Sequence, residues 1–318
     1  MKFIILFLLF IRPLFAMEIL SPPGDKVEVK IFVYMKDVME INDAKKEAKV
    51  NFFLISKWKD HRWKKRFKRK VKIPADEIWN PEIQIVNERD LVEIMGKTVQ
   101  GYPNGEIKYI QRFSGIINMD TDLKNYPFDG QTIHLTLISP DNEVSFTDDE
   151  NQSSMSEKFT IEGWEFSEVK ITTKRIFYGK NKDLTKNTFI FEMEGKRLPG
   201  YFLWHLIIPM ALFLFLGAGV FYISPKELNA RVTISFTIIL TLLAHGFMFL
   251  GKTPDLHFLT KLDVFFAGSL LMTLFIFAST IVTYEIAEED LKKGKRVSRI
   301  LGQVYLGLLG LLLVFILV

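Results

Sequence analysis

The C-terminal part of the chain alternates between long apolar runs and short charged connections. Each run lacks formal charge and is long enough to cross a bilayer as a helix. The runs are Leu198–Ile223, Val232–Gly251, Val264–Tyr284 and Ile300–Val318. This pattern predicts a four-helix transmembrane bundle over residues 198–318.

The preceding part of the chain has the two-residue period of strands. Apolar residues occupy every second position from Val27 to Val33. Similar patterning recurs in Val50–Trp58, Lys97–Tyr102, Ile107–Ile117, Thr132–Ile138, Glu165–Thr173 and Thr188–Glu194. Tyr102–Gly105 reads Tyr-Pro-Asn-Gly, a hairpin signal because Asn and Gly tolerate positive φ. We therefore expect an all-β, immunoglobulin-like sandwich over residues 17–197.

Polar residues of the second apolar run fall on one stripe. The stripe consists of Thr233, Thr237, Leu240, Ala244 and Phe247, at spacings of four, three, four and three, so a helix places them on one face. Hydroxyls at one end and a bulky apolar residue midway would suit a pore that closes by dewetting. The alternative is a buried helix whose Ser and Thr side chains bond to their own carbonyls or to neighbouring helices.

Lysine and arginine are unevenly distributed among the connections. Residues 224–231 and 285–299 together carry seven of these basic residues, and residues 251–261 carry two. The positive-inside rule places the first and third connections in the cytoplasm. The sandwich and the C-terminus are then extracellular or periplasmic.

The composition agrees with one exported part and one membrane part. Of the 318 residues, 48% are hydrophobic and 25% are charged. Residues 1–16 have a basic start, an apolar stretch and a terminal Ala16, which predicts a signal peptide cleaved before Met17. An uncleaved anchor is the alternative.

Several chemistries are disfavoured by what the chain lacks. It has no cysteine, which excludes disulfides, thiolate metal sites and cysteine nucleophiles. No HExxH, GxSxG or phosphate-binding glycine loop occurs, so no enzyme activity and no cofactor are expected. His205 and His245 in the first two apolar runs leave open an axial pair for haem in an electron carrier; interhelical hydrogen bonding is the alternative.

Two charged segments admit a binding interpretation and a simpler one. Lys57–Lys72 holds ten basic residues interleaved with aromatics, which fits nucleic acid or a solvated strand and loop. Because the segment is exported, we expect no nucleic-acid partner. The acidic stretch of residues 141–150 lacks the spacing of a calcium loop, which favours a solvated loop over a divalent-cation site.

A motif between Met119 and Ile133 resembles the signature loop of the Cys-loop, or pentameric ligand-gated ion channel, family. Its core is an aromatic residue followed by Pro-Phe-Asp, matched by Tyr126–Asp129. Met119 and Ile133 stand where animal members have bridging cysteines, a departure typical of bacterial members. Further matches, in order along the chain, are Trp58-Lys-Asp60-His-Arg62, Ile78–Glu82, Arg197, Pro209 and the helix Arg231–Ala244.

The resemblance implies a homopentameric receptor channel in the bacterial inner membrane, embedded in lipid, with the second helix lining the pore. Pore-lining residues would be Glu227, Thr233, Thr237, Leu240, Ala244 and Phe247. Residues coupling the sandwich to the Lys252–Lys261 connection would be Tyr126, Pro127, Phe128, Asp129 and Arg197. A non-conducting receptor of the same architecture is the alternative.

The resemblance also places an agonist site between neighbouring sandwiches. Its aromatic walls would be Phe53, Phe177 and Tyr178. Val86 and Pro140 stand where amine receptors carry further aromatics, so the cage for a quaternary ammonium is incomplete. A small primary amine, an aromatic molecule or protons are therefore the expected agonists.

Ion selectivity depends on the segment before the second helix. Glu227-Leu228-Asn229-Ala230-Arg231 shares Ala-Arg with the family's anion channels but lacks their Pro, and it retains Glu227. Five axis-facing Glu227 carboxylates would favour monovalent cations. The alternative is that Glu227 caps the helix or pairs with Arg231.

Overall fold

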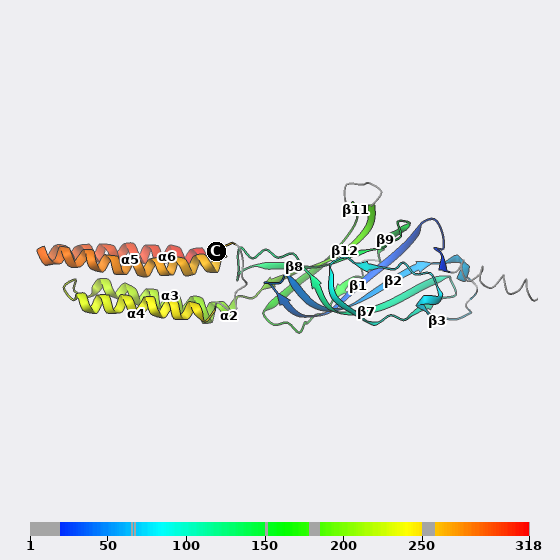
Figure 1. The fold of residues 1–318 in the computed structure, drawn as a ribbon, viewed down its shortest axis with the longest axis horizontal. Helices are drawn as coiled ribbons and strands as arrows, with labels where there is room; N and C mark the ends of the chain where they lie inside the picture. The colour runs from blue at the N-terminus through cyan, green and yellow to red at the C-terminus, as the bar shows by residue number, and fades with distance from the viewer. Residues whose placement is uncertain are drawn as a thin grey trace, which may run out of the picture. The chain divides into compact units, whose positions relative to one another are not determined.

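The computed structural model describes residues 20–64, 66, 68–149, 152–177, 185–249 and 258–317 (Figure 1). The chain divides into two compact units. One holds Met1–Thr121 with Gln131–Gly195, and the other holds Asp122–Gly130 with Lys196–Val318. The expected signal segment, residues 1–16, lies outside the described residues.

The larger sheet of the first unit has eight strands. They are β1 (Val27–Asn42), β2 (Glu47–Lys59), β3 (Val71–Pro74), β5 (Glu88–Met95), β6 (Thr98–Gly101), β7 (Glu106–Asn118), β9 (Val144–Asp148) and β10 (Ser154–Met155). Their order is β10-β1-β2-β7-β6-β3, with β9 paired to β1 and β5 to β7.

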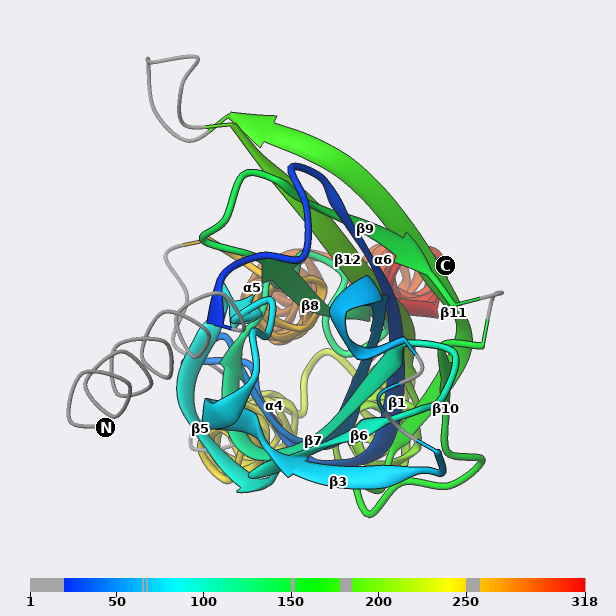
Figure 2. The ribbon, with the colours of Figure 1, turned by 90° about the vertical axis from the view of Figure 1, so that its right-hand side faces the viewer.

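The smaller sheet has the strand order β11-β12-β8-β4. Its strands are β4 (Gln84–Ile85), β8 (Gly130–Ile138), β11 (Trp164–Phe177) and β12 (Thr185–Arg197). In Figure 2, β3, β6 and β7 lie along one side of the sandwich and β11 along another. Short 3-10 turns follow β2 and β3: η1 (His61–Trp63) and η2 (Ala75–Glu77).

The alternating apolar positions fill the space between the sheets. Val29, Ile31 and Val33 on β1 are fully buried, as are Phe52 and Leu54 on β2. Because every second side chain of a strand points to the same face, the pattern in the sequence sets which residues form this core. The all-β sandwich is confirmed.

The predicted hairpin joins β6 to β7. Gly105 has φ +84° and donates its N–H to Tyr102 O at 3.0 Å. A Cβ at this position would lie 3.0 Å from the backbone oxygen of Asp60, so both the backbone angle and the close approach favour glycine.

Among its described residues, the second unit contains four helices that are long and apolar enough to span a membrane: Gly200–Tyr222, Leu228–Phe247, Lys261–Glu289 and Leu291–Leu317. The last three are α4, α5 and α6. The first consists of α2 (Gly200–Phe202), a π-helical segment η4 (Leu203–Ile207), α3 (Ile208–Gly217) and a 3-10 turn η5 (Ala218–Tyr222). Pro209 follows η4 and has no N–H to donate, which accounts for the irregular hydrogen bonding there.

The helices approach one another closely through small residues. A Cβ on Gly302 of α6 would lie 2.9 Å from Phe221 Cβ of η5, so the absence of a side chain permits this contact. Tyr305 of α6 is fully buried and donates its hydroxyl to Leu214 O of α3 at 2.8 Å.

Candidate pore helix and signature loop

One face of α4 is not covered by the other helices of the same chain. All five stripe residues, Thr233, Thr237, Leu240, Ala244 and Phe247, are exposed in the single chain. Leu240 is 64% exposed and Phe247 is 67% exposed. The buried side chains, Arg231, Ser235, Ile238 and Leu242, belong to a different face. The stripe is therefore available to water or to other copies of the chain.

The threonine hydroxyls of this helix bond to its own backbone. Thr237 donates to Thr233 O at 2.8 Å, and Thr241 donates to Thr237 O at 2.7 Å. The back-bonding interpretation and the exposed stripe therefore coexist, because each hydroxyl oxygen keeps its lone pairs for water.

Glu227 occupies the N-cap position of α4 without capping it through its side chain. The side chain is exposed and makes no capping hydrogen bond, whereas the backbone carbonyl accepts from Arg231 N at 3.2 Å. The structure thus does not support the capping alternative.

Arg231 points into the bundle rather than toward Glu227. Its guanidinium is fully buried and donates to Val220 O at 3.1 Å, Thr283 Oγ1 at 2.7 Å and Ser298 Oγ at 3.0 Å. The Ser298 hydroxyl in turn donates to Phe221 O at 2.8 Å. The planar fork of an arginine suits three separate acceptors, so this residue ties the first turn of α4 to η5, α5 and α6.

The signature loop holds a buried ion pair. Asp129 Oδ1 and Oδ2 accept from Arg197 Nε at 2.8 Å and Nη2 at 3.2 Å, respectively. Arg197 N also donates to Asp129 O at 3.0 Å, and the guanidinium lies 4.9 Å from the ring centre of Tyr126. The side chain of Asp129 is 1% exposed and that of Arg197 is 11% exposed. The two-pronged geometry fixes the loop against the last residue of β12.

The same loop covers the start of α5. Lys261 N donates to Lys124 O at 2.9 Å, and Leu262 N donates to Tyr126 O at 3.2 Å. These N–H groups belong to the first turn, which has no partners within the helix. Thr260 and Asp263 complete the cap by a reciprocal capping box. Residues 122–130 thus pack with the helices because their carbonyls satisfy this helix end.

Aromatic rings continue from the loop to the C-terminal end of α4. Tyr126 contacts Phe202 with centroids 5.2 Å apart, Phe202 lies 6.5 Å from Phe249, and Phe249 lies 5.7 Å from His245. His205 stacks on Tyr201 at 4.7 Å. Contiguous packing therefore joins the Asp129–Arg197 pair to the end of α4.

Comparisons with known proteins agree with this architecture. The family described as neurotransmitter-gated ion-channel ligand binding domain matches residues 16–199. The chain belongs to the pentameric ligand-gated ion channel family. It is 27% identical over 283 residues to the proton-gated ion channel of Gloeobacter violaceus, covering 84% of this chain and 76% of that protein. It is 22% identical over 269 residues to the gamma-aminobutyric acid receptor subunit theta of Mus musculus, covering 80% of this chain and 41% of that subunit.

Membership of the channel family supports a ligand-gated ion channel and not an enzyme. The four membrane-length helices after the ligand-binding domain make it a multi-pass membrane protein. The electron-carrier alternative has no counterpart among these relatives, and His205 Nδ1 lies 2.9 Å from Tyr201 O.

The structure describes only part of the expected agonist site. Phe53 is half-buried on β2, and the guanidinium of Arg112 on β7 lies 5.4 Å from its ring centre. The side chain of Phe177 and all of Tyr178 lie outside the described residues. Val86 and Pro140, the positions of the missing aromatics, are both exposed.

The acidic stretch forms local bonds in its described part. Asp141 accepts from Glu143 N at 2.9 Å, and Asp149 forms an ion pair with Lys57. Across the described ranges, no three His, Asp or Glu side chains gather as they would around a metal ion. Glu150 is outside those ranges. In the basic segment, Arg62 pairs with the fully buried Asp60 at 2.8 Å.

The sequence pattern does not predict the environments of two arginines. It marks Arg231 only as part of a selectivity pattern or as a partner for Glu227, and it does not mark Arg112. For Arg231, the available signal is the presence of Thr283 and Ser298 in the membrane part of the chain, since polar residues in membrane helices tend to form hydrogen bonds across helices. Placing Arg112 beside Phe53 requires the pairing register of β2 with β7, in which these two residues lie opposite each other.

Proposed function

We propose that this chain forms a homopentameric, cation-selective channel of the bacterial cytoplasmic membrane, opened by protons or a small ligand. The family is pentameric, and five copies of α4 around an axis would line the pore with Glu227, Thr233, Thr237, Leu240, Ala244 and Phe247. The sandwich and the C-terminus would lie on the outer side of the membrane, as the basic residues of the connections predict.

The observation that carries this proposal is the division of α4 into two faces. Its buried face is bonded into the bundle by Arg231, and its exposed face bears the stripe. A half-polar, half-apolar face uncovered within its own chain suits a water-filled pore with an apolar constriction.

The signature loop would carry motion from the sandwich to this helix. Asp129 and Arg197 would hold Tyr126, Pro127 and Phe128 against the N-terminus of α5. A change at the sandwich would then alter how α5 and the outer end of α4 pack. The buried ion pair and the first-turn hydrogen bonds support this role.

Agonist chemistry is constrained by Arg112. Its guanidinium already covers one aromatic wall, so a quaternary ammonium would meet a like charge at Phe53. Phe177 and Tyr178 would supply the opposing wall from the neighbouring subunit. The relative named a proton-gated ion channel supports a pH step as the first stimulus to test.

Recording from the reconstituted protein under pH steps and a ligand screen tests the proposal. In this cysteine-free chain, Thr237→Cys should make the open-channel current sensitive to a water-soluble thiol reagent. The matched control is Ile238→Cys, because Ile238 is the next residue and is buried in the bundle. If the reagent leaves the open-channel current of both variants unchanged, residue 237 does not line the pore. Lasting silence under all stimuli would favour a non-conducting receptor.

A further inference from the structure

The segment that leads from β2 into β3 concentrates positive charge on the surface of the sandwich. Residues 61–72 contain no aspartate or glutamate. In the part that the structure describes, six basic side chains of this segment are exposed: Lys64, Arg66, Lys68, Arg69, Lys70 and Lys72. These six residues are called the basic loop below.

One further basic residue of the segment, Arg62, has a structural role and is not part of the basic loop. Asp60, fully buried, accepts from Arg62 Nε at 2.9 Å and from Arg62 Nη2 at 2.8 Å. Arg62 Nη2 also donates to Ser21 O at 3.0 Å. The fold therefore uses Arg62 to fix the start of the segment.

The basic loop carries charge that the sandwich itself does not neutralise. Five of its members form no ion pair within the described ranges: Lys64, Lys68, Arg69, Lys70 and Lys72. Crowded like charges repel one another and destabilise a compact state. An external polyanion would offset this repulsion without breaking an existing pair.

The β6–β7 hairpin holds the two ends of the basic loop near each other. Lys70 Nζ lies 5.5 Å from the ring centre of Tyr102, and a Cβ on Gly105 would lie 3.4 Å from Lys64 Cβ. Asp60 N, at the start of the segment, donates to Gly105 O at 2.9 Å. Side chains six residues apart are thus placed beside one turn, so the charges form a cluster and not an extended tail.

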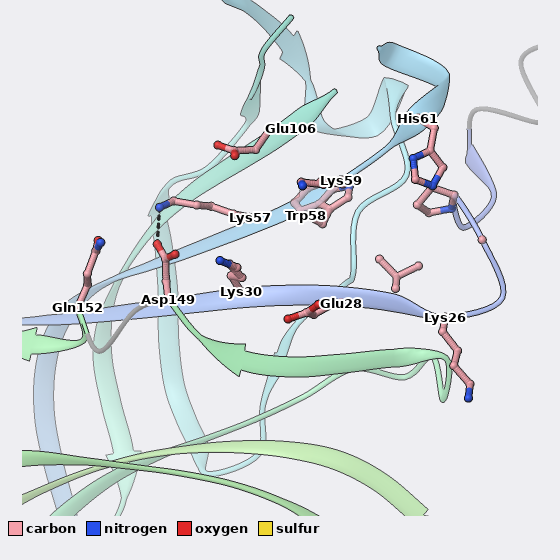
Figure 3. A pocket seen from close by; sticks show the side chains of 13 residues that line it. Lys26, Glu28, Lys30, Lys57, Trp58, Lys59, His61, Glu106, Asp149 and Gln152 are labelled. Carbon is pink, nitrogen blue, oxygen red and sulfur yellow. Dashed lines mark hydrogen bonds and ion pairs between the residues drawn. The ribbon is translucent and has the colours of Figure 1, made fainter. Parts of the chain in front are cut away.

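The cavity beside the last residues of β2 has a different charge balance (Figure 3). Its lining holds four lysines and three carboxylates: Lys26, Lys30, Lys57 and Lys59, and Glu28, Glu106 and Asp149. The dashed line in Figure 3 marks the ion pair between Lys57 and Asp149. Positive charge is therefore in excess at the basic loop and not at this cavity.

The surroundings of the basic loop limit the class of partner. Between Leu20 and Val86, none of the described large apolar side chains is exposed. Trp63 is buried, with the Arg66 guanidinium 5.0 Å from its ring centre. Peripheral membrane sites insert apolar side chains into the lipid, and sites for single-stranded nucleic acid stack bases on exposed rings. The described residues offer neither, so contact through charge remains.

We propose that the basic loop binds a linear anionic polysaccharide on the outer side of the membrane, where the sandwich would lie. The anionic groups of the polymer would contact the exposed lysines and arginines and release the counterions that the polymer holds in water. Binding then weakens as salt rises, in proportion to the number of contacts. The site is separate from the proposed agonist pocket, and its occupation does not depend on the proposed channel activity.

Heparin, a linear sulfated polysaccharide, is the probe for this site. It is titrated into the full-length protein in phosphatidylcholine nanodiscs, which add no net charge. We expect saturable binding that the triple substitution Lys68→Gln, Arg69→Gln and Lys70→Gln weakens at least about tenfold. The slope of log affinity against log salt should also become shallower, because fewer contacts release counterions.

The matched control is the triple substitution Lys36→Gln, Lys45→Gln and Lys158→Gln. These three exposed lysines lie elsewhere on the sandwich, and their loss changes the net charge equally. The affinity of this variant for heparin should stay within about twofold of the parent. Equal weakening by the two triple substitutions, or no saturable heparin binding, would overturn the site.

Two further probes separate a polysaccharide from other anionic partners. Single-stranded DNA and phosphatidylglycerol vesicles should each bind more weakly than heparin at the same salt concentration, because the described residues offer neither rings for stacking nor apolar side chains for insertion. DNA binding as tight as heparin binding would overturn the polysaccharide class. Equally tight vesicle binding would overturn it in favour of a membrane surface.

Discussion

At the scale of single residues, two arginines show how surroundings decide what a charge does. Arg197 lies beside the carboxylate of Asp129, whereas Arg231 is fully buried among carbonyl and hydroxyl oxygens. A buried cation is tolerated only when its hydrogen-bonding groups are satisfied. Both residues therefore hold a fixed geometry, one at the signature loop and the other at the first turn of α4.

The Asp129–Arg197 pair gives the first mutational prediction. Asp129→Asn should lower thermal stability and shift the pH or ligand response to stronger stimuli, because losing one charge of a buried pair costs about 3–5 kcal/mol. Thermal melting of the solubilised protein and dose–response currents measure the two effects.

Asp120→Asn is the control for that substitution, since Asp120 is exposed and lies nine residues earlier in the signature loop. It makes the same change of charge and should leave both measurements close to the parent. An Asp129→Asn variant with parental stability and response would contradict a coupling role for the pair.

At the scale of elements, α4 combines an anchored N-terminal end with a C-terminal end in aromatic contact. Arg231 bonds its first turn to the rest of the bundle, and Phe249 just after its last turn contacts Phe202. Movement arriving through the signature loop would reach the C-terminal end of α4 first. Leu240, between the two ends, is the natural position for an apolar constriction that can dewet.

Leu240→Ser should favour the open state because five hydroxyls would replace five isobutyl groups at the constriction. We expect spontaneous openings and half-activation at about tenfold weaker stimulus, because the closed–open balance shifts toward the open state. Ile239→Ser is the control on the adjacent, partly buried position. If both variants respond like the parent in single-channel records, Leu240 is not the gate.

At the scale of the whole molecule, opposite charges are set apart along the chain. Basic residues are abundant in Lys57–Lys72, whereas Glu227 is an exposed carboxylate directly before α4, the proposed pore helix. In the proposed pentamer each such residue would be repeated five times, so a ring of Glu227 carboxylates would act on every permeating ion. This Glu227 ring is the expected source of cation preference, whereas Arg231 is fully buried in the bundle and would not line the proposed pore.

Reversal potentials under salt gradients test that preference. The parent should reverse near the cation equilibrium potential, and Glu227→Gln should lower cation conductance by at least about twofold as the ring loses its charge. Glu289→Gln removes an exposed carboxylate at the end of α5 and serves as the control. If the current of the parent reverses near the chloride equilibrium potential, the channel is not cation-selective. If Glu227→Gln leaves the cation conductance unchanged, selectivity must arise from other residues.

The sequence by itself determined the features that depend on local period. Alternation along Val27–Val33 follows from the two-residue repeat of a strand, and the α4 stripe follows from the helical repeat. The four spans follow from the thickness of a bilayer. Each of these requires only neighbouring residues, so each could be predicted.

Only the tertiary structure decided which distant groups meet. Arg231 finds Thr283 and Ser298, which lie 52 and 67 residues away, and the carbonyls of Lys124 and Tyr126 meet the start of α5. Such contacts arise from packing and cross-strand register, which a repeat along the sequence does not encode.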